Sequence, residues 1–229
     1  MSEKNEVFER DEALDAQAFA LQSTFRVLLD CMARPGEVGR LEATPTMTAD
    51  AKRAGVLPAT LMLADVLLDA GTTAHVAAPA DPACARTIAR RTHVALAAAD
   101  TAAYAIVPEA VRGDDAAALV AALTPGTLED PHRGATCIVE CATLLGLDAE
   151  GERIGSVSSV HDRSCWELSG PGIKTTSRLE LDRGEAVRAR EERGDEFPCG
   201  IDLVFVDGAG HVAAVPRSTS VKEVAAWDM

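Results

Sequence analysis

Arg217, Ser218 and Thr219 follow directly after Pro216, near the end of the chain. The guanidinium group of arginine and the hydroxyl groups of serine and threonine all donate hydrogen bonds to phosphoryl or carboxylate oxygens. These residues therefore predict a site for an oxyanion at the end of a strand. A polar surface turn is the plainer interpretation of the same residues, and the spacing alone favours that interpretation.

A second candidate is the turn Gly170-Pro171-Gly172. Glycine lets a backbone come close to a ligand, and its amides can form an anion-binding nest. The Walker spacing is absent, so this is no P-loop, and an ordinary tight turn also explains it. Arg26 and Arg34 lie on one predicted helix; they point either into a shared cleft or into solvent.

The elements that must position these residues follow from apolar periodicity. Residues 201–206 and 212–215 are apolar runs that indicate two strands, joined by a turn over 207–210 and ended by Pro216. Near the N-terminus, one apolar stripe recurs in steps of four and three residues and predicts a helix, which Pro35 and Gly36 end. The stripe consists of Leu14, Ala18, Leu21, Phe25, Leu28 and Met32.

Helices and strands are expected to alternate through the middle of the chain. The predicted helices cover 58–70, 81–91 and 114–123, and the predicted strands cover 73–78, 93–97, 104–107 and 135–142. We expect a loop or a short helical turn over 47–55, strand segments within 154–168, and a solvated, highly charged helix over 184–194. This alternation indicates an α/β fold in three layers, with a mixed sheet and helices on both faces. Residues 1–12 form a charged N-terminal segment, and 13–229 a single domain.

Composition excludes several classes of protein. The chain has 229 residues and a formal net charge of −14, which argues against a nucleic-acid partner. No apolar run is long enough to span a bilayer and the first residues are charged, so we expect a cytoplasmic protein with no membrane contact. The six cysteines form no Cys-x-x-Cys pair and lack further zinc ligands at suitable spacing. We expect free thiols that pack in the core and no metal.

Three motifs together resemble a known family. Phe25-Arg26-Val-Leu-Leu-Asp-Cys-Met32-Ala-Arg34-Pro35-Gly36 is similar to an N-terminal motif of the PhnH family, and Leu168-Ser-Gly-Pro-Gly-Ile173 to its central turn. Phe197-Pro-Cys-Gly-Ile-Asp202-Leu, followed by Pro216-Arg-Ser-Thr219, is similar to its C-terminal signature. Each motif alone is weak, but the three occur in the family's order and span most of the chain. Ser218 replaces a threonine that is common in the family and keeps the hydroxyl group.

The resemblance implies a subunit of the bacterial carbon–phosphorus lyase system, which degrades phosphonates. Several subunits of that system together replace the adenine of ATP by a phosphonate. The resemblance also implies a fold like the large domain of pyridoxal-phosphate transferases, without the cofactor. The one lysine near a candidate turn is Lys174, and we expect no Schiff base there. Implied partners are the other lyase subunits in the cell, held through an exposed apolar patch, and a second copy in the isolated protein.

The sequence leaves the role of the candidate residues open. In one hypothesis they line a cleft that holds a phosphonate or nucleotide ligand; the residues are Arg217, Ser218, Thr219, Gly170, Gly172, Arg34 and Arg26. In a second hypothesis the chain is a non-catalytic scaffold, and the same residues serve folding or subunit contact. A third, an independent pyridoxal-phosphate enzyme, is less favoured. No catalytic acid or base can be assigned from the sequence.

Overall fold

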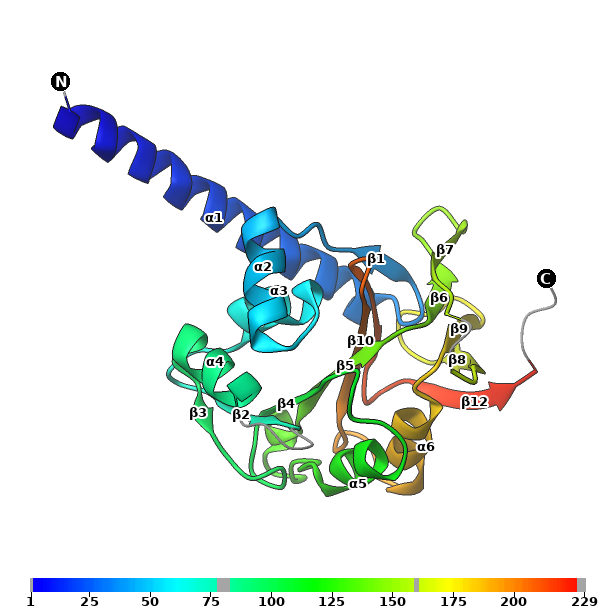
Figure 1. Ribbon diagram of the computed structural model, residues 1–229. Coiled ribbons are helices and arrows are strands. Elements are labelled where there is room, and N and C mark those ends of the chain that lie inside the picture. The colour runs from blue at the N-terminus through cyan, green and yellow to red at the C-terminus, as the bar shows by residue number, and fades with distance from the viewer. Residues whose placement is uncertain (1, 78–82, 159–160, 226–229) are drawn as a thin grey trace.

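The computed structural model describes residues 2–77, 83–158 and 161–225, with side chains described from residue 17 onward. The α-helices are α1 (Ser2–Ala33), α2 (Pro45–Ala54), α3 (Pro58–Leu67), α4 (Ala83–Thr92), α5 (Asp114–Ala122) and α6 (Gly184–Glu192). A short 3-10 helix covers Pro131–Arg133. Figure 1 shows a long α1 on a body built from two sheets.

The larger sheet has seven strands in the order β1-β11-β10-β5-β4-β2-β3. They are β1 (Val38–Arg40), β2 (Thr73–Val76), β3 (Ala95–Leu96), β4 (Tyr104–Val107), β5 (Thr136–Cys141), β10 (Asp202–Asp207) and β11 (His211–Val215). The strands from β10 to β3 run parallel, whereas β11 and β1 are antiparallel additions at one side. The sheet is therefore mixed, as predicted.

Both faces of this sheet are covered, which explains why its central strands are apolar on both sides. In β10, Leu203 and Phe205 pack into one core and Val204 and Val206 into the other. The second core lies under α1, α3 and α4. The first lies under α5, α6 and the smaller sheet, so helices lie on both faces and the predicted layered α/β class is confirmed (Figure 1).

The smaller sheet was not expected as a separate unit. Its antiparallel strands lie in the order β12-β8-β9-β6-β7. They are β6 (Leu144–Leu147), β7 (Arg153–Ser156), β8 (Ser164–Ser169), β9 (Ser177–Leu181) and β12 (Ser220–Val224). An isolated parallel bridge between Glu37 and Leu147 ties the chain just before β1 to this sheet. The two sheets are thereby joined near the end of α1.

Two predictions about helices were wrong. The segment over 184–194 is not a solvated helix, because Ala186, Val187 and Arg190 of α6 are buried. The segment over 47–55 is not a loop or a short turn but most of α2. The Thr44 hydroxyl accepts a hydrogen bond from the amide of Met47 at its start, and Gly55 ends it in the left-handed conformation.

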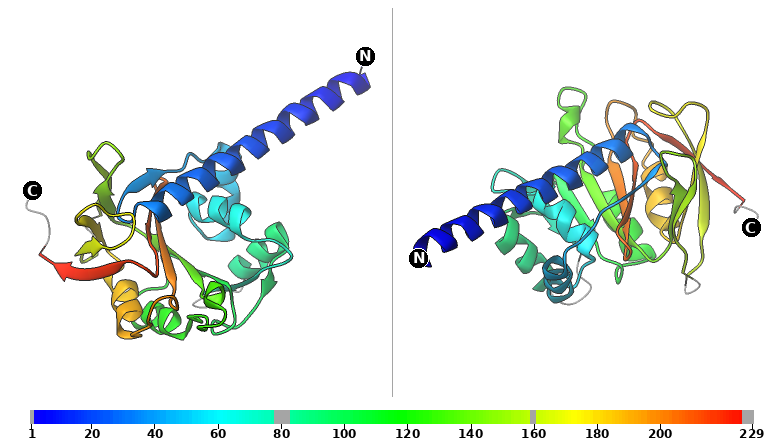
Figure 2. Two further views of the ribbon diagram at one scale, coloured as in Figure 1. Left: turned by 180° about the vertical axis from the view of Figure 1, so that it is seen from behind. Right: turned by 90° about the horizontal axis from the view of Figure 1, so that it is seen from above.

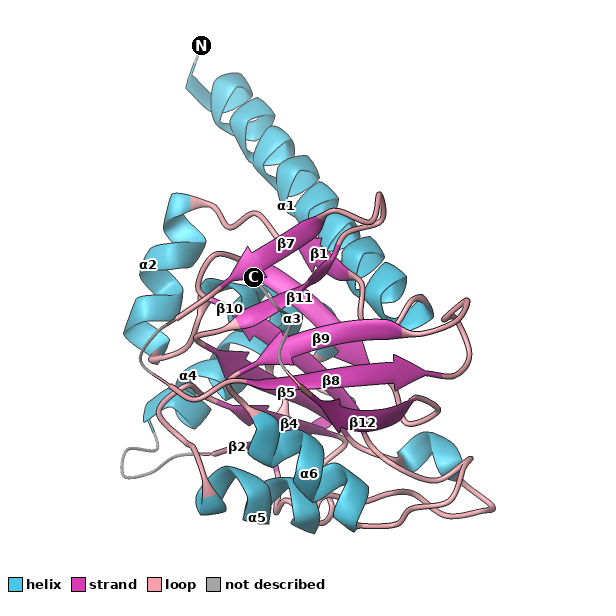
Figure 3. Ribbon diagram, turned by 90° about the vertical axis from the view of Figure 1, so that its right-hand side faces the viewer, coloured by secondary structure: helices cyan, strands magenta, loops and turns pink. Residues whose placement is uncertain are grey.

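Helix α1 is longer than the predicted stripe and runs without interruption across the expected division between residues 12 and 13. Its last turns pack on β11, α3 and β1, whereas its N-terminal part extends away from the body in every view (Figures 2 and 3). Gly36 follows with a φ of 87°, where glycine is favoured. None of the described helices is both long and apolar enough to cross a bilayer.

Candidate functional site

Three turns that are distant in sequence lie together in the fold. We name them the three-turn junction: residues 33–36, 170–172 and 217–219. Strand β12 pairs with β8 so that Ser220 faces Ser169, which places the turn before β12 beside the turn after β8. A Cβ atom at Gly170 would lie 2.9 Å from the carbonyl oxygen of Ser218, and one at Gly172 would overlap the carbonyl oxygen of Ala33. Close backbone approach therefore accounts for both glycines.

Arg217 is turned into the protein. Its guanidinium group donates to both carboxylate oxygens of Asp202, to the carbonyl oxygen of Pro131 at 2.6 Å and to that of Gly134 at 3.0 Å. The Arg217 amide also donates to Asp202 at 2.7 Å. Asp202 begins β10 and Gly134 lies just before β5. We name Arg217 and its partners Asp202, Pro131 and Gly134 the amino-edge clamp, because they lie where the parallel strands start. The Arg217 guanidinium group, which was predicted to hold a ligand, is therefore engaged within the protein.

Arg190 of α6 reaches the same turn from inside. Its Nη2 donates to the carbonyl oxygens of Pro216, at 2.8 Å, and Thr219, at 2.9 Å. Burial lowers the pKa of this guanidinium group, partly offset by the nearby Glu191. The turn 216–219 is therefore held by two arginines, and the Thr219 hydroxyl is buried with no hydrogen-bond partner among the described residues.

The other predicted cations lie differently. Arg34 is exposed at the end of α1 and forms ion pairs with Asp30, at 3.2 Å, and Glu37, at 2.6 Å. The carboxylate of Glu37 raises the pKa of Arg34. Arg26 is exposed about two turns earlier on α1. The structure thus brings Arg34, Gly170, Gly172 and the turn 217–219 together and leaves Arg26 apart from them.

The opposite edge of the larger sheet carries a polar network that the sequence did not reveal. Strands β4, β5 and β10 are parallel and end at this edge. Near the end of β5, the buried Glu140 accepts hydrogen bonds from the Leu57 amide (2.6 Å), the Thr60 hydroxyl (2.6 Å) and the Glu109 amide (2.9 Å). Leu57 has no side chain that can cap α3, so a carboxylate from the sheet takes that role. Burial raises the pKa of Glu140, although these donors oppose the shift.

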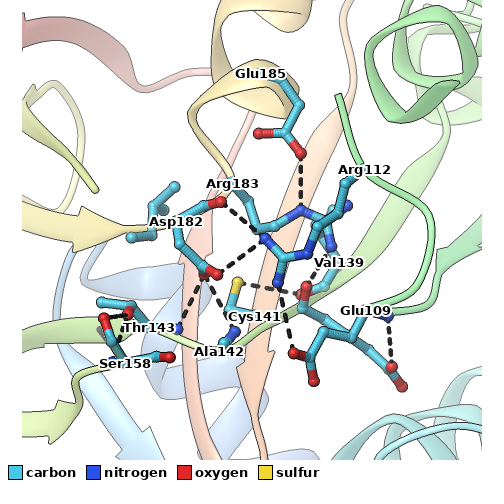
Figure 4. A network of polar contacts seen from close by, with 12 residues as sticks. Glu109, Arg112, Val139, Cys141, Ala142, Thr143, Ser158, Asp182, Arg183 and Glu185 are labelled. Carbon is cyan, nitrogen blue, oxygen red and sulfur yellow. Dashed lines mark hydrogen bonds and ion pairs between the residues drawn. The ribbon is translucent and has the colours of Figure 1, made fainter. Parts of the chain in front are cut away.

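Two arginines complete this carboxyl-edge network, which consists of Glu109, Arg112, Glu140, Asp182 and Arg183 (Figure 4). Arg183 is fully buried and donates to the carbonyl oxygens of Glu140, at 2.6 Å, and Val111, at 2.5 Å. Asp182 accepts the amides of Ala142 and Thr143 and forms an ion pair with Arg112 at 2.9 Å. The network joins the loops that follow β4, β5 and β9.

Two hollows open at this edge. One, of about 590 Å³, is lined by Gly55, Val56, Leu57, Glu109, Ala110, Arg112, Glu140 and His161. The other, of about 250 Å³, shares Arg112 and His161 with it. The Arg112 Nη2 is buried without a hydrogen bond among the described residues, although it forms a longer ion pair with Glu109 at 3.6 Å. The edge can therefore offer the Arg112 guanidinium group to a small polar molecule, whereas both oxygens of the Glu140 carboxyl group already accept hydrogen bonds within the protein. A single carboxylate within the apolar run of β5 was the one sequence signal for it.

The described residues offer few side chains suited to hold a pyridoxal-phosphate cofactor or a metal ion. Lys174 is exposed in the turn after Ile173, whereas a Schiff-base lysine is expected in a buried pocket. No cluster of His, Cys, Asp and Glu suited to a metal ion occurs among the described residues. Of the six cysteines, Cys31, Cys137, Cys141 and Cys165 are buried, and Cys84 and Cys199 are half-buried. Burial raises the pKa of Cys137 to about 12, so this thiol is protonated and suited to packing.

Comparison with known proteins gives consistent matches over nearly the whole length. A family model described as bacterial phosphonate metabolism protein (PhnH) matches residues 12–222. HtxG of Stutzerimonas stutzeri, named as a C-P lyase subunit, is 30% identical over 210 residues, which cover 90% of this chain and 87% of that protein. The PhnH subunit of the alpha-D-ribose 1-methylphosphonate 5-triphosphate synthase of Rhizobium meliloti is 31% identical over 220 residues, covering 89% and 91%.

Proposed function

Because this chain belongs to the PhnH family of bacterial phosphonate metabolism proteins, we propose that it is a subunit of the multi-subunit synthase of a carbon–phosphorus lyase system. The observation that carries the proposal is the family match over residues 12–222, which includes the three motifs and both edges of the larger sheet. Two relatives named as subunits of such systems align with most of the chain and over most of their own length. The chain accordingly works with other lyase subunits.

The reaction that we propose for the assembly is the transfer of a phosphonate to the ribose of ATP. A phosphonate oxygen bonds to C1 of the ribose, the bond from C1 to adenine breaks, and adenine leaves with a proton. The product is a ribose 1-methylphosphonate 5-triphosphate when the phosphonate is methylphosphonate, as in the name of the Rhizobium meliloti relative. This chain supports that transfer as one subunit; no catalytic residue is assigned to it.

The role of the three-turn junction has two alternatives. In the first, its residues help to hold a phosphonate or nucleotide, and the accessible positions of Arg34 and Gly172 support this. In the second, the junction serves folding and subunit contact, and the internal hydrogen bonds of Arg217 favour this for Arg217 itself. A pyridoxal-phosphate enzyme is a weaker third alternative, because Lys174 is exposed. A purified protein that is colourless and does not react with borohydride would remove it.

The test of the function is reconstitution of the assembly. The chain is co-expressed with the other subunits, and phosphonate-dependent release of adenine from ATP is measured with and without it. We expect a stable hetero-oligomer whose activity falls strongly when the chain is omitted. Adenine release that is unchanged without the chain would contradict the proposal. Light scattering of the isolated chain tests the expected homodimer separately.

Two variants then separate the alternatives for Arg217. Arg217→Ala removes the guanidinium group, and Asp202→Asn weakens the same amino-edge clamp while Arg217 remains. Equal loss of assembly in both variants supports a structural role. Intact assembly with activity lost only in Arg217→Ala supports a ligand role. If neither variant changes assembly or activity, Arg217 has neither role.

A further inference from the structure

The helices α2, α3 and α4 are basic, although the chain as a whole is acidic. Together they carry five basic and two acidic residues, which gives +3, whereas the whole chain has a net charge of −14. Helix α4 alone has three arginines and no acidic residue. The three helices contact one another and cover one face of the larger sheet (Figure 1). Like charges gathered in this way repel one another and attract an anion.

A hollow between α2 and α4 collects three of these arginines. It has a volume of about 310 Å³ and is lined by Asp50, Arg53, Leu61, Thr87, Arg90 and Arg91. Leu61 of α3 is buried and gives the hollow an apolar wall, whereas Arg53 and Arg90 are exposed. A hollow with an apolar wall and an excess of one charge focuses the electric field on what enters it.

Asp50 is the one carboxylate among the residues that line the hollow, and both of its oxygens are engaged. Arg53 donates to its Oδ1 at 2.9 Å and Arg91 donates to its Oδ2 at 3.2 Å. Arg91 also donates to both carboxylate oxygens of Asp65, at 2.6 and 2.7 Å. These carboxylates therefore fix Arg91 and orient Arg53, but they do not cancel the positive charge of the hollow.

Arg90 keeps its guanidinium group available. It makes no hydrogen bond or ion pair with any residue in the described part of the chain. Thr87 lies one turn earlier on the same side of α4 and adds a hydroxyl group. Basic residues in the last turns of α2 and α4 complement the helix dipoles, which explains part of this pattern. It does not explain why two helix ends present their arginines to one hollow.

An apolar groove adjoins the hollow and indicates what else the ligand contains. It has a volume of about 460 Å³ and shares Asp50 and Arg91 with the hollow. Leu21, Met47 and Met62 are among the residues that line it. Because methionine and leucine adapt to the apolar face of a ring, a nucleobase suits this groove when the charged end of the same molecule lies in the hollow.

We propose that the hollow formed by Arg53, Thr87, Arg90 and Arg91 binds the phosphoryl or phosphonate oxygens of a small molecule. Guanidinium and hydroxyl groups donate to such oxygens, and three guanidinium groups match the several negative charges of a triphosphate. The adjoining groove favours a nucleoside triphosphate over a free phosphonate. The inference rests on the proposed function for the identity of these two ligands, and it goes further by assigning a binding site to this chain.

The test titrates the full chain by calorimetry with three probes: ATP, tripolyphosphate and methylphosphonate. One double variant combines Arg53→Ala with Arg90→Ala. The control combines Arg133→Ala with Arg178→Ala, which removes the same charge from exposed positions outside the hollow. Thermal unfolding confirms that each variant is folded. We expect ATP and tripolyphosphate to bind about tenfold more weakly to the first variant and to bind the control as they bind the wild type.

Hydrogen exchange supplies an independent measurement, in which we expect amides of residues 50–53 and 87–91 to gain protection when tripolyphosphate is added. Tighter binding of ATP than of tripolyphosphate would support the nucleotide, and binding of methylphosphonate alone would assign the same site to the phosphonate.

Equal affinity of the first variant and the wild type would overturn the inference, as would equal losses in both double variants. Absence of binding of all three probes to a chain that joins the other subunits would also overturn it and would leave the proposed function intact. Failure of the wild type to join the other subunits would instead overturn the proposed function and leave the binding result unchanged.

Discussion

The two edges of the larger sheet use arginines in different ways. At the amino edge, Arg217 is paired with Asp202 and with carbonyl oxygens, and its donors are largely satisfied within the fold. At the carboxyl edge, Arg183 is equally engaged, but the neighbouring Arg112 lies beside two hollows. Its buried Nη2 makes no hydrogen bond among the described residues and forms only a longer ion pair with Glu109, at 3.6 Å. In open α/β sheets, ligands bind outside the carboxyl ends of the strands.

This difference separates two roles of an arginine in the interior. A guanidinium group whose partners all lie within the protein stabilises the fold, whereas a guanidinium group beside a hollow can still donate a hydrogen bond to a ligand. The amino-edge clamp carries the family's C-terminal motif, so the most recognisable residues are those that hold the fold together. The carboxyl-edge network is less recognisable in sequence and has more capacity to bind.

The largest effect is expected at the carboxyl edge, for Arg183→Ala. The substitution removes a fully buried charge and leaves the carbonyl oxygens of Val111 and Glu140 without their donor. We expect the free energy of unfolding to fall by about 4 kcal/mol, measured by urea denaturation. Arg188→Ala in α6, the helix that follows Arg183, is the control; its exposed pair with Glu223 predicts a loss of about 0.5 kcal/mol. Similar losses in the two variants would contradict the conclusion that Arg183 stabilises the fold more than an exposed arginine does.

Arg217→Ala should have the next largest effect. Loss of the half-buried pair with Asp202 is expected to lower the free energy of unfolding by about 3 kcal/mol. Asp202→Asn should cost somewhat less, and the double variant should cost less than the sum, because both changes remove one interaction. Strict additivity in thermal unfolding would show that the two residues act independently.

Gly172→Ala tests the three-turn junction. A Cβ atom there would overlap the carbonyl oxygen of Ala33, and the φ of 84° disfavours any side chain. We expect a loss of about 2 kcal/mol in the free energy of unfolding. Gly55→Ala separates the two causes, because Gly55 has a φ of 72° in the left-handed region but open space around its Cβ position. Its loss should be about 1 kcal/mol, and an equal loss at both positions would remove the argument from close approach.

The smallest effect concerns pH and Glu140. Burial raises the pKa of this carboxyl group in the folded protein above its ordinary value of 4.5. The unfolded chain therefore loses the proton first, and stability contributed by Glu140 declines as the pH rises from about 4.5 through the folded-state pKa. Glu140→Gln should flatten this decline in a series of denaturation curves. A stability difference between the two proteins that stays constant across this pH range would contradict the shift.

The sequence predicted most strands of the larger sheet but few of the polar contacts at their ends. Apolar runs located β5, β10 and β11, because strands buried on both faces are written in the sequence as continuous apolar residues. The tight turn predicted over 207–210 makes β11 return antiparallel to β10, as the structure confirms, and this direction puts Arg217 at the amino edge. The segment Ser220–Val224 is charged and half-exposed, so nothing local marked it as the strand that brings Ser218 beside Gly170.

Contacts between distant residues account for the other differences. Glu140 is hydrogen-bonded by groups more than thirty residues earlier, so no local pattern reveals that it caps α3. The segment of α6 was predicted to be solvated because it is rich in charged residues, whereas Arg190 is buried and donates to the carbonyl oxygens of Pro216 and Thr219. The hypothesis that these turns line one cleft came from the family motifs. Backbone contacts bring Gly170 to Ser218 and Gly172 to Ala33, whereas the Arg217 guanidinium group turns toward Asp202.

The shape of α1 has a mechanical consequence. At 32 residues it is a rod of about 48 Å, and only its last turns rest on the body. A rod fixed at one end is a lever, so a load applied to its N-terminal part is borne where its last turns pack on β11, α3 and β1. The bridge from Glu37 to Leu147 passes that load to both sheets at once.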